Sequence, residues 1–147
     1  MSESNLPQFQ GRVQLRPRYE ETDQGGIIHH SRYVVWFETA RTEWLRDQGL
    51  PYKAMEERGI RLLVSEVKTR YLKPAYYDDL ITILTRVKSC GGARIQLEYE
   101  VLGPEQEILC LGETVLACVD VDRGKPTRLP AELIQIAKAV DEVGKCP

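Results

Sequence analysis

The sequence predicts an α+β domain in which an antiparallel sheet packs against one long helix. One strand-like segment is followed by a long helical segment and then by four strand-like segments in succession. This order lacks the alternation of strands and helices that builds a doubly wound parallel sheet. At 147 residues the chain suits one domain with one core, so residues 1–147 are assigned to a single domain.

The spacing of apolar residues places the first three elements. Residues 12–19 alternate polar and apolar side chains, as a half-buried strand does, and Pro17 indicates an edge or a bulge there. In residues 32–48 the apolar side chains recur at helical spacing and form one broad aromatic stripe. Residues 51–59 begin with proline and end with glycine, which predicts a short extra helix.

Strand patterns fill most of the second half of the chain. β-Branched and aromatic residues dominate four segments, 60–72, 80–89, 94–102 and 108–121. The links between these segments are short and turn-like, so neighbouring strands are expected to be antiparallel. Five long strands can curve around the helix and cover its aromatic stripe. A C-terminal helix is predicted after Pro130, with one apolar face made by Leu133, Ile136, Ala137 and Val140.

Charge and composition argue against several classes of protein. Twenty Lys and Arg residues against 22 Asp and Glu give a net charge of −2, which provides no overall positive field for nucleic acid. No segment approaches the ~20 apolar residues of a membrane-spanning helix, and the N-terminus lacks a signal-peptide pattern, so the cytoplasm is expected. The cysteines form no CxxC pair and are expected to be free thiols rather than disulfides or zinc ligands: Cys90, Cys110, Cys118 and Cys146.

The stretch ETDQGGIIHHSRY, residues 21–33, gathers the groups best suited to chemistry. Gly25 and Gly26 permit backbone angles closed to other residues and let a ligand approach the main chain. The first N–H groups of the following helix have no acceptor within the helix, so they can hold the negative charge that develops during acyl transfer. Asp23 would then activate water or attack as a nucleophile.

Simpler interpretations of the same residues stay open. An aspartate and two glycines occur in many strand-to-helix turns, so Asp23 could do no more than cap the turn, with Ser31 as the helix N-cap. His29 and His30 are the only histidines of the chain, and adjacent side chains diverge, so no metal site and no cofactor are predicted. No GxSxG or Walker motif offers another centre.

Two segments carry a resemblance to a known family. RYEETDQGGIIHHSRYVVWFETARTEWLRDQG, residues 18–49, closely resembles the signature of the 4-hydroxybenzoyl-CoA thioesterase family of hotdog-fold proteins, especially the acyl-CoA thioesterase branch that includes the Tol-Pal-associated enzymes. VSEVKTRYLKPAYYDDLITI, residues 64–83, is similar to the second and third strands of that family. The resemblance implies a five-stranded antiparallel sheet curved around one long helix. It also implies a homodimer or homotetramer that binds acyl-CoA where two protomers meet.

The resemblance assigns roles to four residues of the loop and its flanks. Asp23 matches the catalytic aspartate that opens a D-x-x-G turn, and Gly26 matches the glycine that closes it. His30 matches the position whose backbone N–H faces the thioester carbonyl. Tyr19 matches a tyrosine that lies near the aspartate.

Further residues are matched to the substrate. His29 stands where the family usually has an aromatic residue, which places it, with Tyr33, at the acyl pocket. Four basic residues are candidates for contacts with the CoA phosphates: Lys88, Arg94, Lys125 and Arg128. The predicted activity is hydrolysis of an acyl-CoA thioester to free acid and CoA. The alternatives are a non-catalytic module that binds acyl-CoA or acyl carrier protein, and a dehydratase acting on a hydroxyacyl thioester.

Overall fold

A six-stranded antiparallel sheet and one long helix dominate the computed structural model, which describes residues 9–144 of the chain. The strands are β1 (Gly11–Leu15), β2 (Ile60–Tyr71), β3 (Ile81–Gly91), β4 (Arg94–Leu102), β5 (Ile108–Asp120) and β6 (Lys125–Pro126). The helices are the 3₁₀ turn η2 (Tyr19–Glu21), α1 (Arg32–Asp47), α2 (Tyr52–Glu57) and α3 (Ala131–Gly144). The predicted class, with one short extra helix and one C-terminal helix, is confirmed; β6 is an additional two-residue strand.

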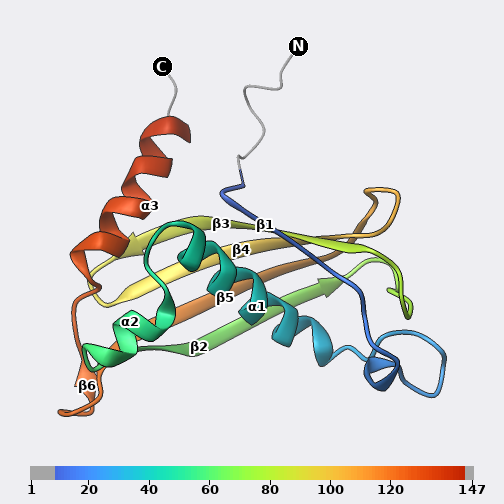
Figure 1. The fold of residues 1–147 in the computed structure, drawn as a ribbon, viewed down its shortest axis with the longest axis horizontal. Coiled ribbons are helices and arrows are strands. Elements are labelled where there is room, and N and C mark those ends of the chain that lie inside the picture. Colours follow the sequence, from blue (N-terminus) through green and yellow to red (C-terminus); the bar gives the residue numbers. More distant parts are fainter. Residues whose placement is uncertain (1–8, 145–147) are drawn as a thin grey trace.

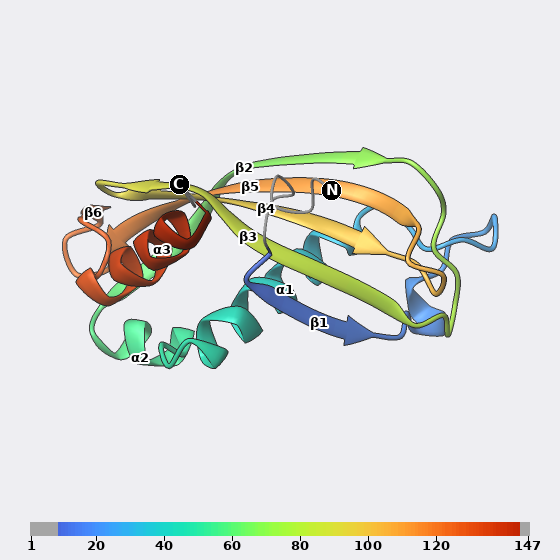
Figure 2. The same cartoon turned by 90° about the horizontal axis from the view of Figure 1, so that it is seen from above.

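The sheet has the strand order β1-β3-β4-β5-β2, with β6 paired to the end of β5. Strands β1 and β2 therefore form opposite edges, and the sheet curls around α1 (Figure 2). Seen along the shortest axis of the molecule, α1 lies across one face of the sheet (Figure 1). The curved sheet around one helix that the resemblance implied is confirmed.

Strands β2 and β3 follow each other in the sequence, run in opposite directions and are not neighbours. β2 pairs with β5, from Ile60 opposite Asp120 to Tyr71 opposite Cys110. Residues 72–80 carry the chain back across the sheet to β3. Three strand spacings of ~4.8 Å separate β2 from β3, a distance that an extended link of this length can span.

Close packing of α1 on the sheet depends on a glycine in β5. The ring of Phe37 on α1 stacks on Tyr99 of β4, with 4.5 Å between centroids, and is fully buried. A Cβ atom on Gly112 would lie 2.2 Å from Cζ of Phe37, well inside van der Waals contact. The missing side chain at Gly112 therefore lets the helix approach the sheet.

Local departures from the predicted boundaries have simple causes. β1 ends at Leu15, before the buried Pro17, which cannot donate to a ladder, and the chain then forms η2 rather than more strand. Pro51 is the N-cap of α2 rather than its first helical residue.

Two of the predicted thiols lie in the core, and the fourth cysteine lies outside the part of the chain that the structure describes. Cys110 and Cys118 are buried, and burial raises the pKa of Cys110 to about 11. Cys146 lies beyond residue 144. The apolar face predicted for α3 includes the buried Leu133 and Ala137. Within residues 9–144, no helix is long and apolar enough to span a membrane.

Candidate active site

The loop between β1 and α1 is anchored by a buried carboxylate. Glu21, only 5% exposed, accepts a hydrogen bond from Nε1 of Trp36 at 3.0 Å and another from the N–H of Arg18 at 2.8 Å. Its carbonyl oxygen accepts from the N–H of His29 at 2.8 Å. Because Trp36 belongs to α1, these bonds fix the loop against the first turns of the helix.

Asp23 organises the turn that precedes the helix. Its carbonyl accepts from the N–H of Gly26 at 3.1 Å, and its N–H donates to the carbonyl of Ile27 at 2.8 Å. Side-chain Oδ1 accepts from the N–H of Gly25 at 2.8 Å. Gly26 has φ of +83°, which residues with a side chain rarely adopt. The capping role of Asp23 is therefore real, and it occupies one carboxylate oxygen.

The second carboxylate oxygen of Asp23 is available. Among the residues that the structure describes, no donor contacts Oδ2, and the side chain is only partly buried. No hydrogen bond or ion pair joins Asp23 to His30 within this part of the chain. Oδ2 of Asp23 is therefore an acceptor without a donor among the described residues, in the loop that precedes α1. This position suits a base that takes a proton from water.

The start of α1 has no side-chain cap among the described residues. Ser31 holds the N-cap position, but its hydroxyl makes no bond to the helix. It lies 2.8 Å from Nδ1 of His29, and the N–H of Ser31 donates to the same nitrogen at 3.2 Å. The rings of His29 and His30 stack with 4.2 Å between centroids.

A cavity of about 380 Å³ lies beside this turn. Its lining combines the loop, the first turn of α1 and the segment after β2: Asp23, Ile27, Ile28, His30, Tyr33, Tyr71, Leu72, Lys73 and Pro74. The structure thus brings together three of the predicted site residues, Asp23, His30 and Tyr33. Tyr71 to Pro74 were not predicted to take part, although they lie in the second segment that carries the resemblance.

Tyr33 closes the inner side of the cavity. Its ring is buried and meets Tyr71 edge-on, with 5.0 Å between centroids. Burial raises the pKa of Tyr33 to about 12, although a backbone hydrogen bond at Ala75 opposes the shift. The phenol therefore stays protonated at neutral pH and serves as a wall of the pocket rather than as a base.

Three predicted site residues of the loop and its flanks lie outside the cavity lining: Tyr19, Gly26 and His29. The ring of Tyr19 is 77% exposed and packs edge-on against Tyr77, with 5.6 Å between centroids. His29 faces Ser31 and the ring of His30. His29 therefore supports the segment that precedes α1.

The four basic residues proposed for CoA lie far along the sheet from Asp23. Lys88 and Arg94 lie near the β3–β4 turn, and Lys125 and Arg128 lie in or next to β6. Both elements are at the end of the sheet near α3, opposite the loop that precedes α1 (Figure 1). Lys88 is also paired with Glu98 and Glu113. The structure does not bring Lys88, Arg94, Lys125 and Arg128 to the cavity.

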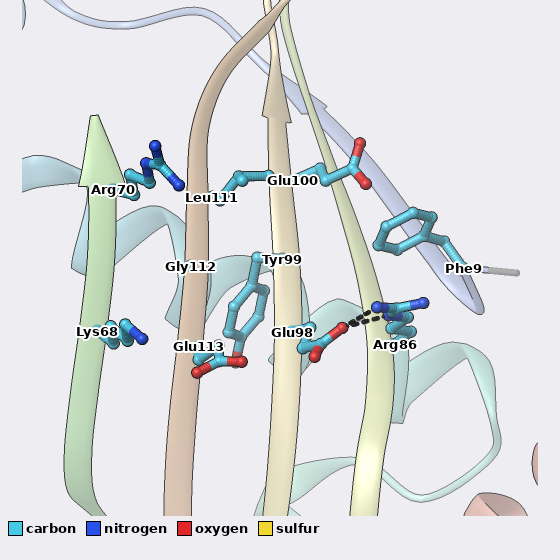
Figure 3. A pocket seen from close by; sticks show the side chains of 10 residues that line it. All are labelled: Phe9, Lys68, Arg70, Arg86, Glu98, Tyr99, Glu100, Leu111, Gly112 and Glu113. Carbon is cyan, nitrogen blue, oxygen red and sulfur yellow. Dashed lines mark hydrogen bonds and ion pairs between the residues drawn. The ribbon is translucent and has the colours of Figure 1, made fainter. Parts of the chain in front are cut away.

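A second cavity, of about 390 Å³, lies on the outer face of the sheet (Figure 3). Tyr99 points inward to Phe37, so its neighbour Glu98 points to the outer face. Glu98 pairs there with Arg86, as the dashed lines in Figure 3 show. Glu113, which also lines this cavity, pairs with Lys88, and Asp23 is not part of the lining. The cavity is a poorer candidate for acyl transfer because two of its three carboxylates, Glu98 and Glu113, are paired with cations and no helix start lines it.

A curved antiparallel sheet around one long helix is the hotdog fold, and the similarities to known proteins place the chain in the class of hotdog-fold thioester hydrolases. The chain belongs to the thioesterase-like superfamily, whose family model matches residues 17–137. The chain is 32% identical to the acyl-CoA thioester hydrolase YbgC of Escherichia coli, over 82% of this chain and 90% of that protein. It is 34% identical to the acyl-CoA thioesterase YbgC of Haemophilus influenzae, over 81% and 88% of the two chains.

A solved structure agrees with the family. The DHNA-CoA thioesterase of Staphylococcus aureus superposes with a TM-score of 0.85 at 30% identity and covers 92% of this chain and 95% of its own. The predicted family and the predicted enzyme class, thioester hydrolase, are confirmed.

Proposed function

We propose that this chain hydrolyses acyl-CoA thioesters to the free carboxylic acid and CoA, with Asp23 as the group that activates the attack. The names of its relatives support the substrate class. The observation that carries the chemistry is the uncommitted Oδ2 of Asp23 in a cavity that His30 also lines. The cytoplasmic location stays a prediction.

The proposed reaction begins with attack of water on the thioester carbonyl. Oδ2 of Asp23 accepts the proton of that water while the new C–O bond forms. The carbonyl oxygen becomes negatively charged, and the N–H of His30 at the start of α1, where the helix dipole is positive, stabilises it. The tetrahedral intermediate then expels the CoA thiolate, which is a good leaving group. Direct attack by Asp23, through an anhydride, is the alternative first step.

An assay of thiol release across a panel of acyl-CoAs tests the proposal. The panel contains short, long and aromatic acyl groups, and each member is also tested for binding. We expect stoichiometric CoA thiol and free acid from at least one class. Tight binding without thiol release would instead indicate a binding module, and an enoyl product without free thiol would indicate a dehydratase.

We also propose that a second copy of the chain covers the β2 edge. Three apolar residues on this edge, Leu63, Val64 and Val67, are 51%, 43% and 42% exposed. Beneath it, Nη1 of Arg41 is buried without a hydrogen-bond partner among the described residues. An exposed apolar strand edge favours pairing with another chain, and buried polar atoms without a partner are rare in native structures. Two β2 strands running antiparallel about a two-fold axis would cover both features.

A charge on this edge is expected to separate the copies. Val67→Asp places a carboxylate in the proposed interface, where desolvation should weaken association at least ~100-fold. Sedimentation velocity on wild type and variant measures the change in mass. Val121→Asp is the matched control, because Val121 is also a valine at 45% exposure but lies in the turn after β5. A Val67→Asp protein with the wild-type mass would contradict the proposed interface.

A further inference from the structure

Tyr71, the last residue of β2, stands in the wall of the Asp23 cavity and reaches the start of α1. Its hydroxyl donates to the carbonyl oxygen of His30 at 2.7 Å. Its ring also meets the ring of His30 edge-on, with 6.4 Å between centroids. Residues 30 and 71 are distant in the sequence, so this bond ties the edge strand to the loop that carries the chemistry.

The peptide group between His30 and Ser31 is held at both ends. Tyr71 binds its carbonyl, and Nδ1 of His29 accepts its N–H at 3.2 Å. The preceding residue is fixed as well, because the N–H of His29 donates to Glu21 at 2.8 Å. Both sides of His30 are therefore fixed by hydrogen bonds to groups outside the helix.

This arrangement leaves one main-chain donor free. The N–H of His29 donates to the carbonyl of Glu21 at 2.8 Å. The N–H of Arg32 donates to the carbonyl of His29 at 3.0 Å. That of Ser31 donates to an imidazole. Within residues 29–32 as the structure describes them, only the N–H of His30 donates to no protein atom. The donor available to a ligand is thus the one that lies next to the peptide bound by Tyr71.

We propose that Tyr71 is a positioning residue: its hydroxyl fixes the main chain of His30, so that the free N–H is pre-organised to receive the developing oxyanion. The inference rests on the proposed function. Donors fixed before the reaction stabilise the transition state without reorganisation, whereas a donor that pivots loses part of that effect. Tyr71 acts through His30 and need not touch the reacting atoms.

Tyr71→Phe removes the hydroxyl and keeps the ring. If the tyrosine positions the oxyanion donor, kcat should fall about tenfold while KM stays within about twofold, because the lost interaction belongs to the transition state. The shape of the pH–rate profile should not change. Tyr76→Phe is the matched control, since Tyr76 is 48% exposed and its hydroxyl makes no hydrogen bond among the described residues.

A binding measurement separates this proposal from the proposed function. A ketone analogue of acyl-CoA, in which a difluoromethylene group replaces the thioester sulfur, forms a hydrate that resembles the tetrahedral intermediate and cannot be hydrolysed. Tyr71→Phe should weaken its binding several-fold and leave the binding of CoA alone unchanged. This comparison holds even if the wild-type protein releases no thiol from any acyl-CoA, a result that would refute only the proposed function.

Three results would overturn the role of Tyr71. An unchanged kcat together with unchanged analogue binding would show that the hydrogen bond has no function. A higher KM with normal kcat would show that the residue only lines the pocket. Loss of one limb of the pH–rate profile would show that Tyr71 itself transfers a proton.

Discussion

Asp23→Asn is expected to reduce thioester hydrolysis by about 100-fold or more, the usual contribution of a general base. The asparagine side chain keeps the shape, and its amide oxygen can accept the bond that Gly25 donates to Oδ1 at 2.8 Å. The turn should therefore keep its form while the second oxygen becomes an amide nitrogen, which cannot accept a proton. Steady-state thiol release, with the best acyl-CoA of the panel, measures the loss.

The Asp23→Asn variant should fold as the wild type does. The free energy of unfolding should change by less than ~1 kcal/mol, because the two N–H groups that donate to Oδ1, those of Gly25 and Ile27, keep an acceptor in the asparagine. Asp47→Asn serves as the control, since Asp47 is an exposed aspartate at the other end of α1. Activity of Asp23→Asn within a few-fold of wild type would refute both the base and the nucleophile mechanisms.

Gly112→Ala is expected to destabilise the fold by about 3 kcal/mol, the upper part of the range for overpacked cores. The new Cβ would lie 2.2 Å from Cζ of Phe37 and 2.5 Å from Cε2, so either the ring or the whole of α1 must move. Urea unfolding followed by circular dichroism measures the effect. Because α1 carries His30 at its start, thiol release should fall as well.

Two further variants show whether the contact with Phe37 is the cause. Gly91→Ala is the control, because a Cβ at Gly91 would meet no atom within 4 Å. Its effect on stability should stay below ~0.5 kcal/mol. Combining Gly112→Ala with Phe37→Leu removes the far end of the ring, so the double variant should be more stable than the sum of the two single effects predicts. Strict additivity would exclude this contact as the source.

The parts of the fold that depend on local spacing could be predicted from the sequence. The aromatic stripe that contains Phe37 and the glycine after each helix predict the bounds of α1 and α2 to within one or two residues. The D-x-x-G turn is equally local, since all of its hydrogen bonds lie within residues 23–27. Short-range patterns carry this information directly.

Strand partners and cavity walls could not be predicted in the same way. Nothing in the pattern of residues 60–72 shows that this strand pairs with β5 rather than with β3, because both pairings bury similar apolar faces. The place of Tyr71 opposite His30 follows from that pairing and was missed for the same reason. The resemblance makes Lys88 a candidate phosphate contact, and its ion pairs with Glu98 and Glu113 could not be predicted because these partners are distant in the sequence.

The pairing of β1 with β3 also bears on how the chain folds. Gly11 lies opposite Thr85, and the walls of the Asp23 cavity come from residues 71–74. Contacts between such distant segments raise the contact order, which slows folding. During synthesis the ribosome makes the loop with Asp23 among the first residues, yet this loop gains its cavity only after β2 and its partner strand β5 have emerged. Until then the aromatic stripe of α1 has no sheet to cover it, so the nascent chain exposes it to chaperones and to aggregation.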